Sequence, residues 1–580
     1  MEYAPIPKMP PEQMAVRPNL VDYETMRANF SWDNVRNELD GLPGGKLNIA
    51  YECLDRHLKT GRRHKIAMLW EGKSGERETY TFEEMCRASN KVAHGLHSLG
   101  VQAGDRVFVF LERVPECYFT VFGTLKLGAV IGPLFSAFGP EAVKDRLENS
   151  EAKVLVTSPE LWARVRDVRS DLPHLKQVLL VTRRQRPAPE AGVALWDDVI
   201  TPQPDEFETV ATDPEDFAVM HYTSGTTGKP KGAAHVHMAI LGHYATAKYV
   251  LDLHDEDVYW CTADPGWVTG TSYGMFGPWS SGATSLVYEG GFGASAWYSL
   301  IERYRVTVWY TAPTAIRMLM KAGPEAAKKH DLSSLRYMCS VGEPLNPEAI
   351  VWGQKVLGLP FHDNWWQTET GCILIANYPV QEIRPGSMGR PFPGIEPAII
   401  DDEGRVVPPG EEGNLAIRPG WPSMFRTYWK NEEMYRSRFR DGWYITGDRA
   451  RMDSDGYFWF VGRADDVINT AGHLVGPFEV ESVLIEHPAV AEAGVIGKPD
   501  PVAMEVVKAF VALKDGYQSD EKLRRELIHY ARERLGPAVA PREIEFLPGL
   551  PKTRSGKIMR RLLKARELGL PEGDTSTLED

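Results

Sequence analysis

The chemistry of this chain is most evident in one stretch, Thr223 to Gly232. Its sequence, Thr-Ser-Gly-Thr-Thr-Gly-Lys-Pro-Lys-Gly, combines hydroxyls, glycines and lysines, and the apolar run Phe217 to Met220 precedes it. Glycine lets backbone N–H groups approach phosphate oxygens, hydroxyls donate further hydrogen bonds, and lysine offsets negative charge. The stretch therefore predicts a strand followed by a polyphosphate-binding loop. A polar surface turn is the alternative, and the spacing is not the G-x-x-x-x-G-K-[ST] pattern.

Four further motifs follow in order along the chain. They are Trp365-Trp366-Gln367-Thr368-Glu369-Thr370-Gly371, Tyr444-Ile445-Thr446-Gly447-Asp448, Gly462-Arg463-Ala464-Asp465-Asp466 and Pro551-Lys552-Thr553-Arg554-Ser555-Gly556-Lys557. With the first stretch, they resemble the adenylate-forming superfamily of acyl-CoA synthetases, luciferases and adenylation domains of peptide synthetases. The resemblance covers nearly the whole chain. The segment from Gly45 to His57 resembles the leader of the acetyl-CoA synthetase branch.

This resemblance implies an AMP-forming acid–thiol ligase, which in the acetate-using branch converts acetate, ATP and CoA to acetyl-CoA, AMP and pyrophosphate. A carboxylate is a poor acyl electrophile, whereas an acyl-adenylate offers a thiol the leaving group AMP. Because the first step brings a carboxylate to a triphosphate, cations and oriented donors must offset like charges. Mg²⁺ is the expected cofactor, because it bridges phosphate oxygens.

The resemblance also implies roles for individual residues. Glu369 matches the Mg²⁺-associated glutamate, and Lys557 matches the lysine that bridges the substrate carboxylate and the α-phosphate. Asp448 matches the aspartate that accepts hydrogen bonds from the ribose hydroxyls. The remaining expected ATP contacts are Thr223, Ser224, Gly225, Thr226, Thr227, Gly228, Lys229, Gly342, Glu343, Pro344, Asp363, Asn364, Trp365, Trp366, Gln367, Thr368 and Arg463.

Trp366 also occupies the position where the acetate-using branch carries a tryptophan at the floor of the acyl pocket. The other matching positions of that pocket are Trp267, Val268, Thr269 and Val341. Indole is large and rigid, so little beyond a methyl group is expected to fit. Since one methylene in an apolar pocket is worth only ~1–3 kcal/mol, we expect propionate to be a slow substrate.

The expected CoA contacts are Thr269, the loop Ala471-Gly472-His473, and Arg532. The loop matches one that approaches the pantetheine after the small domain rotates, and Arg532 matches an arginine that meets the nucleotide phosphate. Leu474 departs from the pattern, because the acetate enzymes usually carry an arginine there that reaches the ATP phosphates.

Composition excludes several classes of function. The chain has 580 residues with a net charge of −13, which argues against nucleic acid as the main partner. We find no long apolar run for a membrane span, and the first residues lack the features of a signal peptide, so a cytoplasmic enzyme is expected. Six widely spaced cysteines give no zinc pattern. The basic run from Lys552 to Arg566 suits either a solvated helix face or a polyanion such as ATP or CoA.

The alternation of apolar strands and helical stretches predicts an α/β protein. As the family would imply, we expect a large N-terminal domain of stacked α/β sheets (46–464) with a barrel-like part at 384–460. A Pro-rich, irregular wrapping segment (1–45) precedes it. A small, mobile α+β lid domain (465–580) follows, with its hinge at Asp465. Apolar residues at helical spacing predict a helix over 521–535 with one core face.

Two rival activities stay open. The first is a propionate or other short-chain acyl-CoA synthetase, and the second is an adenylation module that loads a carrier protein. The acetate-type leader and the short chain beyond Lys557 disfavour the second, and a light-emitting oxidase is remote. A lysine acetyltransferase or deacetylase acting on Lys557 is a candidate partner. The sequence is silent on oligomeric state and on the direction of the reaction in the cell.

Overall fold

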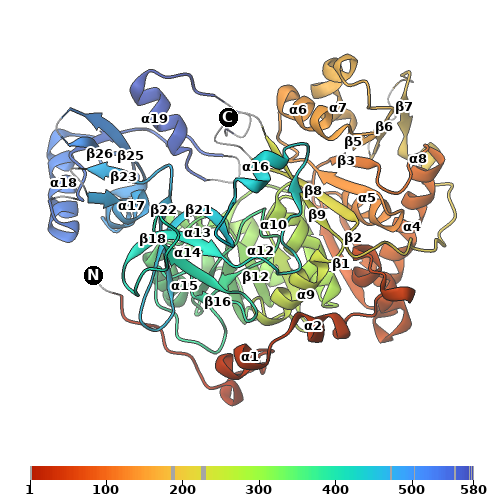
Figure 1. The fold of residues 1–580 in the computed structure, drawn as a ribbon, viewed down its shortest axis with the longest axis horizontal. Helices are drawn as coiled ribbons and strands as arrows, with labels where there is room; N and C mark the ends of the chain where they lie inside the picture. The colour runs from red at the N-terminus through yellow and green to blue at the C-terminus, as the bar shows by residue number, and fades with distance from the viewer. Residues whose placement is uncertain are drawn as a thin grey trace.

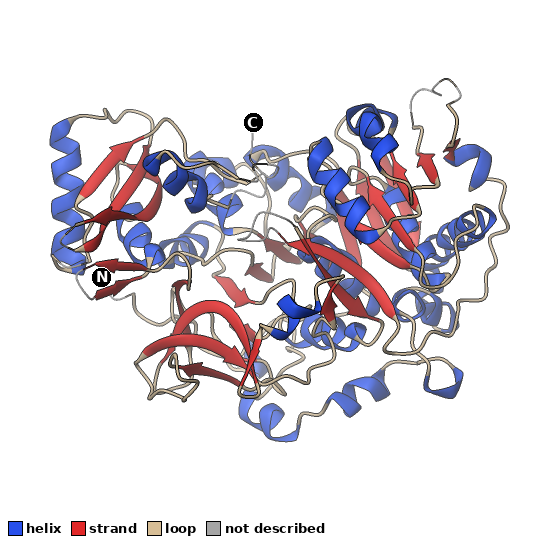
Figure 2. Cartoon of the chain, turned by 45° about the horizontal axis from the view of Figure 1, so that its top comes forward, coloured by secondary structure: helices blue, strands red, loops and turns tan. Residues whose placement is uncertain are grey.

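The computed structural model describes residues 3–183, 188, 190–223, 230–470, 473–501, 503–537, 539–553, 557–573, 575 and 578. Two bodies make up the chain, a large N-terminal domain and a smaller C-terminal domain that packs on one side of it (Figure 1). Both combine helices with sheets, so the α/β fold with stacked sheets and a small C-terminal domain is confirmed (Figure 2). Among the described residues, no helix has the length and apolarity needed to span a membrane.

The first sheet of the large domain has eight strands in the order β19-β9-β8-β4-β3-β5-β6-β7. The run Phe217 to Met220 forms the start of β8, as predicted, and β8 ends at Thr223, where the Gly-rich loop begins. The strands are β3 (Arg106–Phe110), β4 (Val130–Pro133), β5 (Val154–Thr157), β6 (Gln177–Leu180), β7 (Val193–Leu195), β8 (Phe217–Thr223), β9 (Lys231–Val236) and β19 (Thr427–Tyr428). The helices of this region are α4 (Phe82–Ser98), α5 (Pro115–Lys126), α6 (Pro140–Ser150), α7 (Pro159–Val165) and α8 (Trp196–Val199).

The second sheet has nine strands in the order β16-β15-β14-β13-β12-β10-β11-β1-β2. They are β1 (Ile66–Glu71), β2 (Arg77–Thr81), β10 (Val258–Cys261), β11 (Thr284–Tyr288), β12 (Val308–Thr311), β13 (Tyr337–Ser340), β14 (Phe361–Trp365), β15 (Ile375–Ala376) and β16 (Arg390–Pro391). Its helices are α9 (Ala239–Tyr249), α10 (Val268–Thr271), α11 (Gly277–Ser280), α12 (Ala294–Tyr304), α13 (Pro313–Ala322), α14 (Pro324–Ala327) and α15 (Pro347–Val356). Strands β10 to β14 pair in parallel, so their carboxyl ends meet at one edge, where an open α/β sheet binds ligands.

A separate five-stranded antiparallel sheet follows in the chain. Residues Asp401 to Gly404 form a turn, because Ile400 pairs with Val406 and the N–H of Asp401 donates to the carbonyl of Arg405 at 2.9 Å. The elements are β17 (Pro397–Ile400), β18 (Glu412–Ile417), α16 (Glu432–Arg436), β20 (Phe439–Arg440), β21 (Trp443–Met452) and β22 (Phe458–Arg463).

The C-terminal domain has its own five-stranded sheet and its own core. The helix predicted over 521–535 is confirmed as α18, which buries Leu523, Leu527 and Ala531 and is capped by Asp520. The elements are β23 (Ile468–Thr470), β24 (His473–Val475), α17 (Pro477–Ile485), β25 (Val490–Asp500), β26 (Met504–Leu513), α18 (Glu521–Leu535), β27 (Glu543–Phe546) and α19 (Arg560–Leu568).

The segment before residue 46 is less irregular than its Pro-rich sequence indicates. It contains the helices α1 (Tyr23–Asn29) and α2 (Trp32–Glu38), and α3 (Ile49–Cys53) follows shortly after. The side chains of Asp22 and Ser31 accept hydrogen bonds from the first turns of α1 and α2, so N-caps compensate for the brevity of both helices. The segment runs along the lower edge of the large domain in Figure 1.

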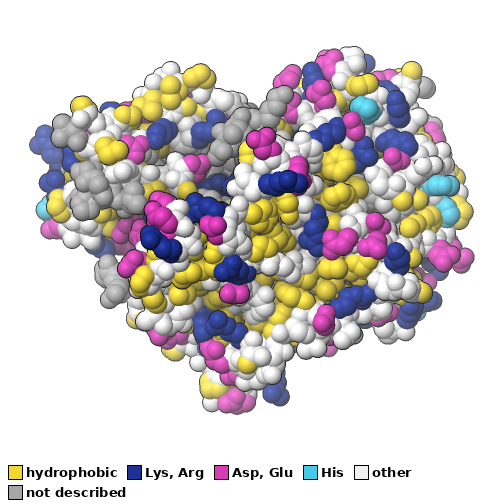
Figure 3. Space-filling model, viewed as in Figure 1, with side chains coloured by type: hydrophobic (Ala, Val, Ile, Leu, Met, Phe, Trp, Pro, Cys, Tyr) yellow, Lys and Arg dark blue, Asp and Glu magenta, His cyan; other side chains and the backbone are white. Residues whose placement is uncertain are grey.

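The basic run near the C-terminus does not form one solvated cationic face, which was the first interpretation of its sequence, whereas its suitability for a polyanion stays a prediction. Most of its described cations pair with nearby carboxylates, and the pairs are Lys552 with Glu492, Arg560 with Glu481, Lys564 with Glu505, and Arg566 with Glu572. On the face seen in Figure 3, basic and acidic side chains are likewise interspersed. Lys552, Lys557 and Arg560 of this run line a cavity.

The loop that follows β14 depends on a close backbone approach at Gly371. Gly371 has φ +71°, and a Cβ there would lie 2.2 Å from the carbonyl oxygen of Ser423. We expect Gly371→Ala to lower the free energy of unfolding by more than the ~1–3 kcal/mol that a strained backbone costs alone, because Ser423 must also move. Gly358→Ala is the matched control, since Gly358 has φ +81° with nothing near its Cβ position. Equal losses in chemical denaturation would show that the contact with Ser423 is unimportant.

Candidate active site

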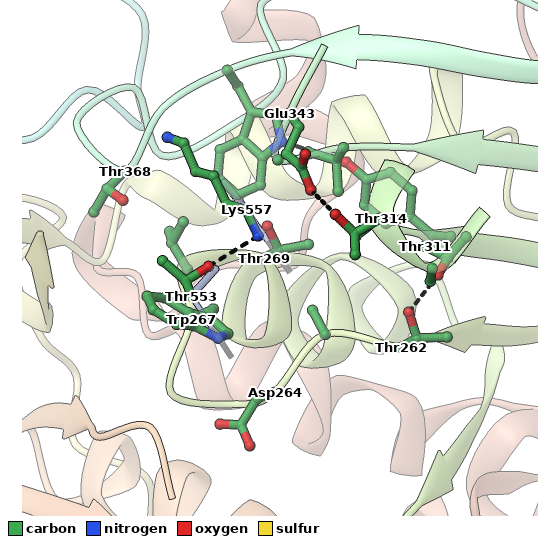
Figure 4. A pocket seen from close by; sticks show the side chains of 18 of the residues that line it. Thr262, Asp264, Trp267, Thr269, Thr311, Thr314, Glu343, Thr368, Thr553 and Lys557 are labelled. Carbon is green, nitrogen blue, oxygen red and sulfur yellow. Dashed lines mark hydrogen bonds between the residues drawn. The ribbon is translucent and has the colours of Figure 1, made fainter. Parts of the chain in front are cut away.

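A cavity of about 1230 Å³ lies where the C-terminal domain meets the large domain. The large domain supplies most of its lining, and the C-terminal domain contributes Glu492, Lys552, Thr553, Lys557 and Arg560. Figure 4 shows side chains from both domains around this space, with Lys557 and Thr553 beside Trp267 and Thr269. The carboxyl ends of β12, β13 and β14 open into it, at the edge that the parallel strands define.

Glu343 lines the cavity just beyond β13. Its carboxylate accepts hydrogen bonds from the hydroxyl of Thr314 at 2.5 Å and from the guanidinium of Arg317 at 2.8 Å. The chain reaches it through Gly342, whose φ of +102° suits glycine. These contacts fix the orientation of the Gly342-Glu343-Pro344 turn, which was expected to line the adenine.

Asp448 presents an acceptor for which no described residue supplies a hydrogen bond. Its Oδ2 accepts from the indole of Trp365 at 2.9 Å and from the amide of Gln367 at 3.0 Å, whereas Oδ1 is buried without a hydrogen-bond partner among the described residues. The Nε of Arg463 lies 3.5 Å from Oδ1. Burial raises the pKa of Asp448, and Arg463 opposes that shift. A buried oxygen of this kind suits a ligand hydroxyl.

Asp363, in the middle of strand β14, is also buried. It accepts a hydrogen bond from the hydroxyl of Ser340 on β13 at 2.6 Å. Burial raises the pKa of Asp363 to about 7, while Ser340 and the backbone N–H groups of Leu345 and Asn364 oppose the rise. This side chain therefore joins the end of β13 to β14 beside the cavity.

The indole of Trp366 borders the cavity and is fixed by two aromatic neighbours. Its ring packs edge-on against Tyr273 with centroids 5.1 Å apart, and its Nε1 lies 3.4 Å from the hydroxyl of Tyr310. Tyr310 in turn donates to the side-chain oxygen of Asn364 at 2.9 Å. Trp267, Val268, Thr269 and Val341 line the same cavity. The residues predicted to form the acyl pocket thus border one cavity, where the indole of Trp366 is held by two aromatic side chains.

A carboxylate and several cations share another part of the cavity. Glu369 accepts a hydrogen bond from the hydroxyl of Tyr428 at 2.7 Å. Lys231 and Arg438 line the same region, and burial, Arg438 and Arg463 lower the pKa of Lys231, whereas Glu369 raises it. No group of three possible metal ligands occurs among the described side chains. A Mg²⁺ ion there would therefore depend on Glu369 and on oxygens of a ligand, a donor set that suits this hard cation.

Lys557 extends into the cavity from the C-terminal domain. Its backbone is fixed on Thr553, whose hydroxyl accepts from the N–H of Lys557 at 3.0 Å and whose own N–H donates to the carbonyl of Lys557 at 2.8 Å. The side chain is exposed to the cavity, yet protein surrounds that space. Burial therefore lowers the pKa of Lys557, and the nearby Arg463 and Arg560 lower it further. An anion in the cavity would restore a favourable environment for this ammonium.

Comparison with known proteins identifies the family of the chain. Residues 54–429 match the family model described as AMP-binding enzyme. The chain belongs to the AMP-binding enzyme family. Residues 479–557 of this AMP-binding enzyme match the model of the family's C-terminal domain.

Relatives of this AMP-binding enzyme extend over nearly all of its length. It is 53% identical over 566 residues to the acetyl-coenzyme A synthetase of Bacillus subtilis, covering 97% of this chain and 98% of that one. It is 45% identical to the acetyl-coenzyme A synthetase of Methanothrix thermoacetophila, covering 92% and 85% of the two chains. The crystal structure of an anthranilate CoA ligase in complex with anthranoyl-AMP superposes with a TM-score of 0.84 at 33% identity, over 93% and 99% of the chains.

Most of the residues singled out in the AMP-binding enzyme's sequence meet at the cavity. The expected ATP contacts that line it are Thr223, Gly342, Glu343, Pro344, Asp363, Asn364, Trp365, Trp366, Gln367, Thr368, Asp448 and Arg463, together with Glu369 and Lys557. Ser224 to Lys229 lie outside the described residues, as do Ala471 and Gly472 and the side chains of His473 and Leu474. Arg532 is exposed on α18 and does not line the cavity, so its CoA contact stays a prediction.

Sequence reasoning missed several lining residues. Lys231 has a visible signal, because it belongs to the Gly-rich stretch after Thr223. Arg438 and Asp264 lie in no recognisable motif, and only the fold brings them to the cavity. Asp264 accepts hydrogen bonds from the N–H of Gly266 at 2.8 Å and the hydroxyl of Ser136 at 3.2 Å, and burial raises its pKa to about 6.

The raised pKa of Asp363 gives a pH-dependent contribution to stability. Because this pKa is about 7 in the folded enzyme and near 4 when unfolded, the contribution is fully present below about pH 4 and is lost as the pH rises through 7. We expect the free energy of unfolding of Asp363→Asn, relative to the unsubstituted enzyme, to rise between pH 5 and pH 7.5. Denaturation curves at the two pH values measure the difference, and Asp402→Asn, in an exposed turn, serves as the control. A difference independent of pH would show that Asp363 is ionised throughout this range.

Proposed function

We propose that this AMP-binding enzyme is an AMP-forming acetate–CoA ligase, which makes acetyl-CoA, AMP and pyrophosphate from acetate, ATP and CoA. The observation that carries the proposal is the indole of Trp366, fixed by Tyr273 and Tyr310 at a cavity that also holds Oδ1 of Asp448, to which no described residue donates a hydrogen bond. The long relatives named acetyl-coenzyme A synthetase support it.

The nucleotide is proposed to lie across the carboxyl ends of β13 and β14. Oδ1 of Asp448 accepts hydrogen bonds from the ribose hydroxyls, because a carboxylate oxygen can take donors that the protein leaves unmatched. The adenine occupies the space beside the Gly342-Glu343-Pro344 turn, which Thr314 and Arg317 hold in place. The triphosphate points toward Thr223, at the end of β8, and toward the loop that follows it.

Glu369 is the side chain that would hold Mg²⁺ together with phosphate oxygens, and the ion would offset phosphate charge during the first step. The hydroxyl of Tyr428 orients the Glu369 carboxylate for this contact. Lys231 and Arg438 border the same region, so cationic side chains of this chain share the task of neutralising a polyanion.

In the first half-reaction, a carboxylate oxygen of acetate attacks the α-phosphorus of ATP, and the bond from that phosphorus to pyrophosphate breaks. Lys557 lies over the cavity from the C-terminal domain, where its ammonium attracts both the acetate carboxylate and the α-phosphate. The methyl group of acetate faces the wall formed by Trp366. Two like-charged reactants can approach because these donors are already oriented.

In the second half-reaction, the sulfur of CoA attacks the acetyl carbonyl carbon, and AMP leaves with the bonding electrons while the thiol proton passes to solvent. Rotation of the C-terminal domain about Asp465 is proposed to withdraw Lys557 and to bring in the loop Ala471 to His473. Thr269, which lines the cavity, is the proposed contact of the thiol end. A cytoplasmic location and control by acetylation of Lys557 accompany this proposal, since acetylation would remove the lysine charge.

The test is to incubate the full chain with ATP, Mg²⁺, CoA and single acids of one to six carbons. The account predicts acetyl-CoA, AMP and pyrophosphate in equal amounts, with the highest kcat/KM for acetate and a lower value for propionate. Pyrophosphate release without any acyl-CoA product would instead favour an enzyme that loads another acceptor.

The role of Trp366 gives a substitution test. We expect Trp366→Gly to shift the preference from acetate toward acids of four to six carbons, because removing the indole opens space beside Tyr273. Trp366→Phe is the matched control and should retain the preference for acetate, since it keeps an aromatic wall. The measurement is kcat/KM for each acid. An unchanged acid profile in the glycine variant would assign the size limit to another residue.

Lys557 gives a test that separates the half-reactions. We expect Lys557→Ala to abolish pyrophosphate release from acetate and ATP, yet to convert preformed acetyl-adenylate and CoA to acetyl-CoA at a near-normal rate. Lys564→Ala is the control, because Lys564 pairs with Glu505 outside the cavity and should affect neither rate. Equal losses of both half-reactions in Lys557→Ala would contradict the proposed withdrawal of this side chain.

A further inference from the structure

The side chain of Asn346 makes no contribution to the helix that it precedes. Asn346 stands directly before α15 in the large domain and is only 3% exposed. An asparagine at the start of a helix normally accepts a hydrogen bond from the first turn through its side-chain oxygen. Asn346 forms no such capping hydrogen bond. Both ends of its amide are therefore available for contacts outside α15.

One end of this amide faces the turn formed by Gly342, Glu343 and Pro344, here called the adenine turn. Oδ1 of Asn346 accepts a hydrogen bond from Nη1 of Arg317, on α13, at 3.3 Å. Nη2 of the same guanidinium donates to Oε2 of Glu343 and to the hydroxyl of Thr314, both at 2.8 Å. Thr314 in turn donates to Glu343, as Figure 4 shows. Because a guanidinium is planar and rigid, Arg317 fixes Asn346 relative to the adenine turn.

The other end of the amide reaches the C-terminal domain. Nδ2 of Asn346 donates to the hydroxyl of Ser482, on α17, at 2.9 Å. Since a guanidinium can only donate hydrogen bonds, the amide oxygen must face Arg317 and the amide nitrogen must face Ser482. The two neighbours thus determine the orientation of the amide. Asn346 completes a chain of hydrogen bonds that runs from the adenine turn to the C-terminal domain.

Helix α17 rests on the large domain at more than this one point. Phe478 packs edge-on against Phe460 of β22, with ring centroids 6.3 Å apart. Phe478 and Ser482 are four positions apart, so they lie on one face of the helix. Gly476, which precedes α17, comes close to β22, because a Cβ there would lie 2.2 Å from the carbonyl oxygen of Val461. The face of α17 that carries Ser482 is therefore the face that docks on the large domain.

We propose that Asn346 is a positioning residue for the first half-reaction: it joins the adenine turn to α17 through Ser482 and so favours the domain orientation in which Lys557 lines the cavity. This inference rests on the proposed two-step function. Asn346 stays with the large domain while Ser482 moves with the other, so rotation about Asp465 separates them. A nucleotide that orders the adenine turn therefore favours docking of the C-terminal domain, and docking in turn strengthens nucleotide binding.

The experiment compares Ser482→Ala with the unsubstituted full chain in each half-reaction, because this substitution removes only one hydroxyl. Single-turnover pyrophosphate release from acetate and ATP should slow about fivefold, the effect of losing one neutral hydrogen bond. Conversion of preformed acetyl-adenylate and CoA to acetyl-CoA should not slow. Ser519→Ala, the same substitution at an exposed position before α18, is the matched control and should change neither rate. An undiminished first rate in Ser482→Ala, or equal losses in both half-reactions, would overturn the inference.

A double-mutant cycle with Asn346→Ala tests whether the two residues act through each other. The combined substitution should slow the first half-reaction no more than Asn346→Ala alone, because the shared hydrogen bond is already lost. Losses that multiply would overturn the proposed link. If these expectations fail while the unsubstituted enzyme makes acetyl-CoA in the same assays, only this inference is wrong. If the unsubstituted enzyme makes none, the proposed function is wrong as well.

Discussion

The site of this enzyme needs charged side chains inside a cavity that protein encloses, and most of the site's structure follows from that constraint. Burial disfavours an isolated charge, so each carboxylate at the cavity is held by donors. Trp365 and Gln367 hold Asp448, while Thr314 and Arg317 hold Glu343. These donors sit at strand ends or on helices, whose positions the two large sheets fix. A ligand can donate hydrogen bonds to a buried acceptor that no described residue satisfies, such as Oδ1 of Asp448.

The same constraint accounts for the placement of Lys557 on a separate domain. An ammonium in this cavity is unfavourable without an anion, as the lowered pKa of Lys557 indicates. Lys557 is proposed to act while the triphosphate is bound and not while the thiol reacts. Such a residue is best placed on a domain that can move away from the cavity. The interface must then be strong enough to form and weak enough to open. A small polar contact, such as that of Asn346 with Ser482, suits that requirement better than a large apolar interface.

Features encoded locally could be predicted from the sequence, and features that depend on distant contacts could not. Trp366, Asp448 and Lys557 stand in short motifs, so their convergence on one site followed from the family resemblance. Helix α18 followed from its apolar spacing. The pairing of the basic run was invisible, because its acidic partners, such as Glu481 and Glu492, lie far earlier in the chain. The β-bridge between Ile6 and Ile383 was equally hidden, because the two residues lie far apart in the chain.

The most direct measurement of the central claim, that one cavity between two domains binds acetate and nucleotide together, is a crystal structure with a non-hydrolysable acetyl-adenylate analogue. The account predicts the ribose hydroxyls on Oδ1 of Asp448, the acetyl methyl against the indole of Trp366, and the ammonium of Lys557 near the carbonyl and the phosphate-mimicking group. An analogue whose acyl end points away from Trp366, or whose ribose lies elsewhere, would contradict it.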